Sequence, residues 1–390
     1  MTLRVAIIGS GLGGLATAIR LAAQGLSVTV YEKRDQPGGR ASAWIEDGFT
    51  FDAGPTVITA PWLLEDLFAL AGDRLEDHVR LVALDPFYRI FFEEGTAFDY
   101  ARDDARMAAN VAALSTVPAD ATGYAAFLER SRQIFERGFT DLSAKPFLHI
   151  SDMLRIAPSL VRLQSQRTVY GLVSSFVEDE RLRQILSFHP LLIGGNPFTA
   201  TSIYALIHHL ERKWGVWFAM GGTTALVRAL EDLAVRLGVS FQYNAEVVGL
   251  PVAAGRVTGV ETMDGVVHPA DIVVSNADPI LTNTVLLPRS AQSRIGSWRL
   301  RRLRQSMSLV VIYFGTDRTY RDDPANRLAH HNIIFGPRYK DLLQDIFAKK
   351  RLASDFSLYL HMPTLTDPAL APDGCEAFYV LAPVPKLAGG

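Results

Sequence analysis

The sequence has little cysteine and no long apolar run. Cys375 is the one cysteine among 390 residues, which excludes an intramolecular disulfide and a zinc site built from several thiolates. This content is typical of a reducing compartment, so we expect a cytoplasmic protein. The longest apolar runs, at 309–314 and 190–193, are far shorter than the roughly 20 residues that a membrane-spanning helix needs. We therefore expect a chain that does not cross a bilayer.

Neither sign of charge is in excess. Lys and Arg number 39 and Asp and Glu number 41, which gives a formal net charge of −2. Such a chain has no overall attraction for nucleic acid, and no nucleic-acid-binding motif occurs in it. Hydrophobic residues make up 48% of the chain, as in ordinary globular proteins, and its length favours two or more domains.

The strongest motif lies in the first 32 residues. An apolar run ends in Gly9-x-Gly11-x-x-Gly14, a helical pattern follows, and a second apolar run ends at Glu32. The glycines of such a βαβ unit allow a tight turn, close approach of the backbone to a pyrophosphate and close packing of helix on strand. The helix N-terminus suits the phosphates. Glu32 is placed to accept hydrogen bonds from two ribose hydroxyls, which disfavours NADP because a 2′-phosphate would be repelled.

A second glycine pair follows directly. Gly38 and Gly39 precede Arg40, and this order brings backbone and a guanidinium against the same pyrophosphate. Together with Phe-Asp-Ala-Gly-Pro at 51–55, the arrangement resembles the flavoprotein amine-oxidase-like superfamily, whose members carry FAD. The resemblance implies FAD as cofactor, with the adenine beside the backbone at 247–248. The expected cofactor-binding residues are Gly9, Gly11, Gly13, Gly14, Glu32, Arg34, Gly38, Gly39, Arg40, Gly54, Pro55 and Val247.

The chain then leaves and rejoins the nucleotide-binding pattern. Residues 88–100 are strand-like, and 103–213 are mostly helical in spacing. From 220 onward an amphipathic helix, a strand, a hairpin and a further short strand follow. We expect an α/β fold, in which a discontinuous Rossmann-like FAD-binding domain (1–75 and 217–285) holds an inserted α+β substrate domain (76–216 and 286–390).

Long segments at 48–61, 85–92, 175–227 and 356–385 resemble bacterial phytoene desaturases of the carotenoid pathway. The resemblance implies FAD-dependent desaturation of phytoene toward more conjugated carotenes by hydride transfer to flavin, since no side chain accepts two electrons. The sequence has only one Gly-x-Gly-x-x-Gly motif, so it shows no second dinucleotide-binding domain for NAD(P)H. A quinone or oxygen is therefore the expected electron acceptor. Two alternatives stay open: a related polyene flavoenzyme (carotene isomerase, ketolase or shorter-precursor desaturase), and a non-catalytic isoprenoid-binding protein of the same fold.

Such desaturases continue past the Leu-Ala-Pro-Val-Pro segment at 381–385 into a second glycine-rich flavin motif. This sequence ends at Gly390 without one. We therefore expect a fragment or a shortened form, in which a sheet edge and part of the cofactor cleft are uncovered.

Catalytic groups are harder to place than cofactor-binding ones. Asp152 and Arg155 stand three residues apart at the start of a helical pattern, where a polar pair can handle the released proton. The alternative is a helix cap paired with Arg155. His189 is a second candidate base, or else a hydrogen-bonded core histidine. The nine histidines show neither His-x-x-x-His nor Glu-x-x-His spacing, even at 208–209 and 330–331, so we expect no metal site.

The implied substrate favours contact with a membrane. A long isoprenoid hydrocarbon gains about 0.8 kcal/mol per CH₂ by staying in lipid, so the enzyme must reach the bilayer as a peripheral protein on the inner face of the cell membrane. Residues 289–304 hold six arginines and no acidic residue, with Trp298, Leu300 and Leu303 interleaved. Such a basic stretch is suited to an anionic leaflet. The alternative is a solvated basic helix. Its arginines are Arg289, Arg294, Arg299, Arg301, Arg302 and Arg304.

Overall fold

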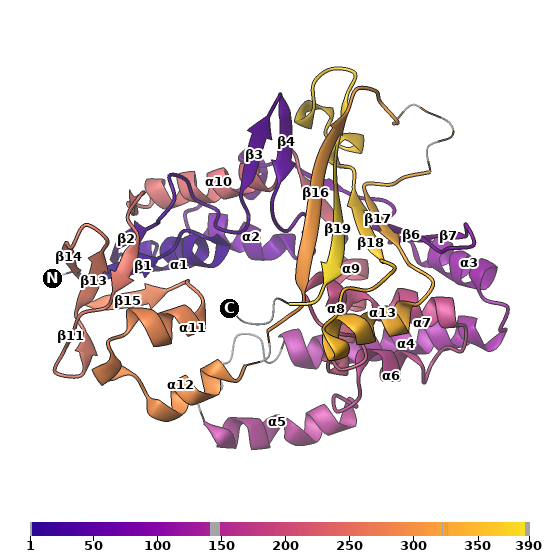
Figure 1. Ribbon diagram of the computed structural model, residues 1–390, viewed down its shortest axis with the longest axis horizontal. Helices are drawn as coiled ribbons and strands as arrows, with labels where there is room; N and C mark the ends of the chain where they lie inside the picture. Colours follow the sequence, from indigo (N-terminus) through magenta and orange to yellow (C-terminus); the bar gives the residue numbers. More distant parts are fainter. Residues whose placement is uncertain are drawn as a thin grey trace. The chain divides into compact units, whose positions relative to one another are not determined.

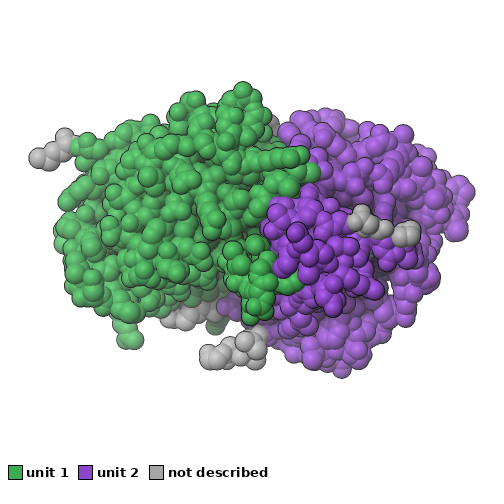
Figure 2. Space-filling view, turned by 90° about the horizontal axis from the view of Figure 1, so that it is seen from above, with its two compact units in different colours: residues 1–82, 218–304 green, residues 83–217, 305–390 purple. Residues whose placement is uncertain are grey.

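The computed structural model describes residues 2–140, 149–303, 305–321, 323, 325 and 327–386, whose helices and strands are drawn in Figure 1. They form two compact units, shown in different colours in Figure 2. Unit 1 comprises residues 1–82 and 218–304, and unit 2 comprises 83–217 and 305–390. The first and third boundaries differ from the expected ones at 75 and 285, and the second lies within one residue of the expected one at 216. Segment 284–292 belongs to unit 1 because Leu286 O accepts from Leu250 N, and the Gln292 amide donates to Thr284 O and Leu287 O.

Unit 1 is built on a four-stranded parallel sheet. Helix α1 (Leu12–Ala22) connects its first two strands in sequence, as the βαβ pattern predicts. The strand order is β15-β1-β2-β9, and each neighbouring pair is parallel. These strands are β1 (Arg4–Ile8), β2 (Ser27–Tyr31), β9 (Ser240–Gln242) and β15 (Ile272–Ser275).

Both faces of this sheet are covered. Val5 and Ile7 of β1 pack in a core with α1 and α10 (Gly222–Arg236), whereas Ala6 and Ile8 pack in a second core with an antiparallel sheet. Side chains alternate along a strand, so each face of β1 contributes to one core. The covering sheet contains β10 (Val247–Gly249), β13 (Gly259–Thr262) and β14 (Val267–Pro269). The expected α/β fold with a Rossmann-like nucleotide-binding part is thus confirmed.

Shorter elements complete unit 1. Strands β3 and β4 form a hairpin that leads into α2, and α11 and α12 follow β15 along the chain. A strand pair, β5 with β8, lies where the chain leaves and re-enters this unit. The bounds are β3 (Ala43–Glu46), β4 (Phe49–Asp52), α2 (Pro61–Ala69), β5 (Leu81–Ala83), β8 (Trp217–Ala219), β11 (Val252–Ala253), β12 (Arg256–Val257), α11 (Pro279–Leu281) and α12 (Arg294–Arg301).

Unit 2 combines a six-stranded mixed sheet with a group of helices. The strand order is β16-β19-β18-β17-β6-β7; β17 runs parallel to β6, and the other neighbours are antiparallel. The strands are β6 (Tyr88–Phe91), β7 (Ala97–Tyr100), β16 (Ser308–Thr316), β17 (His331–Ile334), β18 (Leu358–His361) and β19 (Glu376–Val384). The helices are α3 (Asp104–Leu114), α4 (Ala119–Phe135), α5 (Ile150–Arg162), α6 (Val169–Val173), α7 (Glu180–Ser187), α8 (His189–Leu192), α9 (Leu206–Trp214) and α13 (Tyr339–Gln344).

A row of rings crosses this sheet, with one ring from each of its six strands. Neighbouring rings have centroids 4.6 to 6.3 Å apart. Cross-strand aromatic pairs stabilise a sheet and fix its register. We call this set the aromatic row; its members are Tyr100, Tyr88, His331, His361, Tyr379 and Tyr313.

Candidate functional site

The turn from β1 into α1 needs glycine for two distinct reasons. Gly9 has φ +89°, a left-handed conformation that side chains disfavour. A Cβ atom on Gly14 would lie 2.0 Å from Gly9 O, so only glycine lets the helix start this close to the strand. Gly11 caps α1 without a side chain, and the first turn holds no acidic residue. The N–H groups of that turn have no partner inside the helix, which leaves them available to an anion.

The second glycine loop lies directly against this turn. Gly38 N donates to Ser10 O at 2.9 Å, and a Cβ atom on Gly39 would lie 3.2 Å from Gly11 Cα. The structure therefore brings together the two loops that the sequence places 25 residues apart along the chain, from Gly14 to Gly39. Backbone N–H groups from both can face one diphosphate.

Segment 51–55 packs on the second glycine loop. We call the three segments 9–14, 38–40 and 51–55 the cradle. A Cβ atom on Gly54 would lie 1.9 Å from Arg40 O, so the segment packs on the Arg40 backbone. Pro55 O accepts a hydrogen bond from the Thr223 hydroxyl at 2.8 Å, which ties the segment to the first turn of α10. Gly54 and Pro55 thus shape the cradle through their backbones.

Glu32 supports the turn as well as facing the site. Its carboxylate accepts hydrogen bonds from Ser10 N and Ser10 Oγ, both at 2.8 Å, and from Arg34 N at 3.0 Å. A carboxylate has about four acceptor positions, so one position remains for a ribose hydroxyl. The sequence predicted the ribose contact but missed Ser10, whose side chain holds the buried acid in place.

The two arginines of the motif have different surroundings. Arg34 Nη1 donates to Gly39 O at 2.9 Å, so Arg34 holds the second glycine loop. Arg40 is exposed, and no hydrogen bond or ion pair joins its side chain to another residue in the described ranges. Of the two, Arg40 has the guanidinium that is available to a phosphate.

Strand β10 begins close to Glu32. Ala245 N donates to Glu32 O and Asn244 N to Arg34 O, each at 2.9 Å, and Val247 follows two residues later with 8% of its surface exposed. Val247 packs in the second core of unit 1. Its strand is therefore adjacent to the end of β2, where Glu32 lies.

Asn276 is a site residue that sequence reasoning missed. A Cβ atom on Gly13 would lie 2.6 Å from Asn276 Oδ1, and one on Gly11 would lie 3.0 Å from Asn276 Nδ2. The side chain therefore covers the glycine turn at the carboxyl end of β15, the edge where open α/β sheets bind ligands. The polar Ser-Asn-Ala-Asp run that ends this strand was the available signal.

Asp52 is a buried acid at the start of α10. Its oxygens accept from Thr223 N at 3.0 and 3.1 Å, and burial raises its pKa from 3.8 to about 6. The folded protein then holds this proton more tightly than the unfolded chain, so stability falls as pH rises from 3.8 to about 6. We expect a decrease of about 2 to 3 kcal/mol. Asp52→Asn should flatten the profile in urea titrations, and an unchanged profile would refute this assignment.

The structure places Asp152 in a helix cap. It is the third residue of α5, and its carboxylate accepts from His149 N at 3.0 Å. Arg155 is exposed, and no hydrogen bond or ion pair joins the two side chains within the described part of the chain. The expected pairing with Arg155 is therefore absent there, and a catalytic role for these two residues stays a prediction.

His189 lies in a buried polar network of unit 2. Its Nε2 is 3.0 Å from Glu211 Oε2, and Tyr88 donates to Glu211 Oε1 at 2.7 Å; all three residues are 0 to 1% exposed. His208 Nδ1 is hydrogen-bonded to the Tyr100 hydroxyl at 2.6 Å. Burial lowers the pKa of His208 well below its usual value. The alternative of a hydrogen-bonded core histidine is thus the one that the geometry supports for His189.

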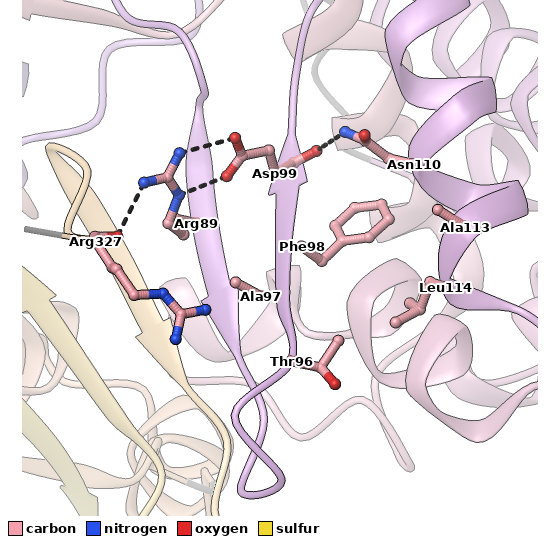
Figure 3. A pocket seen from close by; sticks show the side chains of 9 residues that line it. All are labelled: Arg89, Thr96, Ala97, Phe98, Asp99, Asn110, Ala113, Leu114 and Arg327. Atoms are coloured by element: carbon pink, nitrogen blue, oxygen red, sulfur yellow. Dashed lines mark hydrogen bonds and ion pairs between the residues drawn. The ribbon is translucent and has the colours of Figure 1, made fainter. Parts of the chain in front are cut away.

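A surface cavity of about 350 Å³ lies elsewhere, on β6, β7 and α3 of unit 2 (Figure 3). Arg89, on its wall, donates to both oxygens of Asp99 at 2.6 and 2.9 Å and to Arg327 O at 2.9 Å. Its guanidinium is therefore already neutralised. None of the expected cofactor-binding residues lines this cavity; its lining consists of Arg89, Thr96, Ala97, Phe98, Asp99, Asn110, Ala113, Leu114 and Arg327.

Known proteins that resemble this chain include flavoenzymes, as the geometry of the cradle suggests. The profile of the flavin containing amine oxidoreductases matches residues 12–350. A phytoene desaturase (lycopene-forming) of Pseudescherichia vulneris is 51% identical over 98% of this chain and 77% of its own length, and one of Pantoea ananas is 48% identical over 98% and 76%. An oxidoreductase from Methanosarcina mazei has the same fold, with a TM-score of 0.66 and 18% identity over 98% of this chain and 80% of its own.

Proposed function

This chain belongs to the family of the flavin containing amine oxidoreductases, and we propose that within it the chain is an FAD-dependent phytoene desaturase of carotenoid biosynthesis. Identity of 45 to 51% over 98% of the chain to lycopene-forming phytoene desaturases supports this proposal most strongly. The cradle is evidence for FAD as the cofactor. Its three segments pack so closely that a Cβ atom on Gly14 or Gly54 would meet a backbone oxygen.

The residues of the cradle fit FAD. The first-turn N–H groups of α1 and the exposed Arg40 would hold the diphosphate, and the remaining acceptor position of Glu32 would hold a ribose hydroxyl. Bound FAD supplies the acceptor for a hydride from an allylic carbon of phytoene, while the neighbouring carbon loses a proton and a double bond forms. The cradle fixes the cofactor, and a quinone or oxygen would then take the electrons in a separate step.

The substrate and product are tested with the full chain. Purified protein, FAD, phytoene-loaded liposomes and a quinone should yield carotenes that absorb at longer wavelength, with lycopene as the end product by analogy with the named relatives. NADPH in place of the quinone should give no product, since the reaction needs an oxidant. Chromatography that shows isomerised or oxygenated carotenes instead would favour a related polyene flavoenzyme. Bound phytoene that stays unchanged would favour an isoprenoid-binding protein.

Helix α12 supports docking on an anionic membrane surface. Ile295, Trp298 and Leu303 are 69, 51 and 56% exposed, and the Arg302 guanidinium lies 4.1 Å from the centre of the Trp298 ring. Arg289 and Arg299 are also exposed. The side chains of Arg294 and Arg301 and the whole of Arg304 lie outside the described residues. None of the helices in the described ranges combines the length and the apolar character that crossing a membrane requires.

Replacing Arg289, Arg299 and Arg302 with glutamine should weaken sedimentation with anionic liposomes. Each arginine near the surface contributes about 1 kcal/mol at low salt, and added salt should reduce the difference by screening. Exposed Trp298 should leave a salt-resistant remainder. A matched triple variant, Arg20→Gln with Arg228→Gln and Arg256→Gln, removes the same charge from other exposed positions of unit 1. Equal losses in the two triple variants would show that α12 is not the docking surface.

A further inference from the structure

Three histidines meet inside the sheet of unit 2. His331 on β17 and His361 on β18 are directly opposite each other in an antiparallel pair, and His330 immediately precedes β17. The three residues are 0 to 3% exposed. One ring nitrogen from each lies within 4.8 Å of the others. Two strands far apart in sequence thus form what we call the histidine cluster, which spacing along the chain does not reveal.

Hydroxyl groups fix the orientation of two of these rings. His331 Nδ1 is 2.6 Å from the Tyr359 hydroxyl, and His330 Nδ1 is 2.6 Å from Thr366 Oγ1. This is the outer-shell arrangement of metal-binding histidines, in which one ring nitrogen bonds a polar group and the other faces the ion. Both rings therefore offer Nε2 to the cluster.

The three Nε2 atoms differ in their partners. His330 Nε2 and His361 Nε2 are 2.9 Å apart, a hydrogen bond that requires a proton on one of them. His331 Nε2 is buried and has no hydrogen-bond partner among the described residues. This buried ring nitrogen therefore has a free acceptor or donor position that a bound ion would fill.

We propose that the histidine cluster binds one transition-metal ion of the class that prefers imidazole, with Zn²⁺ as its representative, through a ring nitrogen of His330, His331 and His361. Imidazole nitrogens suit Zn, Cu, Fe and Ni, whereas Mg and Ca prefer oxygen ligands. Three protein ligands leave a fourth tetrahedral position for one small ligand. The ion would join β17 to β18 across the centre of the aromatic row.

The protonation state and the spacing are compatible with binding. Burial lowers the pKa of His330 to about 3 and those of His331 and His361 well below the usual value, so the rings are neutral ligands at pH 7. Zn–N bonds of 2.0 to 2.1 Å in a tetrahedron separate the nitrogens by about 3.3 Å. The 2.9 Å pair must open by a few tenths of an ångström. The ion displaces the proton held between these two nitrogens, and that ring stays neutral by carrying its proton on Nδ1 instead.

The test is metal binding by the full chain without an affinity tag of histidines. Protein stripped with a chelator and dialysed against Zn²⁺ should retain one ion per chain by mass spectrometry. Cobalt in its place should give the intense visible bands of tetrahedral Co²⁺. His330→Gln and His361→Gln should lose the ion, whereas His209→Gln, a partly buried histidine outside the cluster, should keep it.

Several outcomes would overturn the proposal. These are wild-type protein that retains no zinc, zinc that His330→Gln and His361→Gln leave in place, and a cobalt spectrum of octahedral type. If either variant fails to fold by circular dichroism, X-ray absorption of the wild-type zinc protein decides, because the proposal requires three imidazole neighbours. This test is independent of the flavin and of the proposed desaturase activity.

Discussion

Replacing Gly11 with valine is expected to abolish flavin binding while the protein stays folded. Gly11 has φ −65° and ψ 172°, an extended conformation that valine adopts without strain. The added side chain would lie at the start of α1, over the N–H groups that we propose bind the diphosphate. Loss of two charge-assisted hydrogen bonds, about 1.5 to 3 kcal/mol each, raises the Kd by at least about a hundredfold. Flavin absorbance per protein in gel-filtered samples measures the effect.

Asn276 provides the control for this variant. A Cβ atom on Gly11 would lie 3.0 Å from Asn276 Nδ2, so a local clash is a second explanation for lost binding. Gly11→Val combined with Asn276→Ala removes that clash. If the diphosphate needs the space, the double variant stays defective. Full recovery of flavin in the double variant would attribute the loss to the clash and contradict the cradle assignment.

Glu211→Ala is expected to destabilise unit 2 by roughly 2 to 6 kcal/mol, because each of two buried polar groups left without its partner costs about 1 to 3 kcal/mol. It would leave the Tyr88 hydroxyl and His189 Nε2, which bond the two oxygens of Glu211, buried without an acceptor. Urea unfolding followed by tryptophan fluorescence measures the change. Glu211→Gln keeps the shape and one carbonyl acceptor, so its loss should be smaller.

A double-mutant cycle separates the network from simple cavity formation. Tyr88→Phe removes the hydroxyl that Glu211→Ala would leave unpaired. If the hydrogen bond matters, the two losses in free energy of unfolding are not additive. A Glu211→Ala loss below about 1 kcal/mol, the usual value for one neutral hydrogen bond, would contradict the proposed role of this acid.

Sequence reasoning identified the cradle because its signals are local. Gly9, Gly11 and Gly14 lie in one turn, and the strand, helix and acid around them are continuous in sequence. The contact of Gly38 with Ser10 was also predictable, because the superfamily pattern places the two loops at one diphosphate. The α/β fold followed from the same patterns. Ser10 was missed, since its role depends on how Glu32 turns toward it.

Contacts between distant segments were outside the reach of sequence patterns. Asn276 covers Gly13 only because β15 pairs with β1, 267 residues away for Val5 and Ile272. His361 joins His331 only through the pairing of β17 with β18, so a search for helical His spacing predicted no metal site. The division at 304 differs from the boundary expected at 285 for a similar reason, because the hydrogen bond of Leu286 O with Leu250 N holds the later segment on unit 1.

Anaerobic mixing of the FAD-loaded full chain with phytoene-loaded liposomes tests the proposed function most directly. Without a quinone or oxygen, only the bound flavin can accept electrons. We predict that flavin absorbance is lost in step with the appearance of a more conjugated carotene, one new double bond per flavin, and that the Gly11→Val variant shows neither change. Flavin that stays oxidised while bound phytoene is unchanged, or a new carotene that forms without loss of flavin absorbance, would contradict desaturation by this chain.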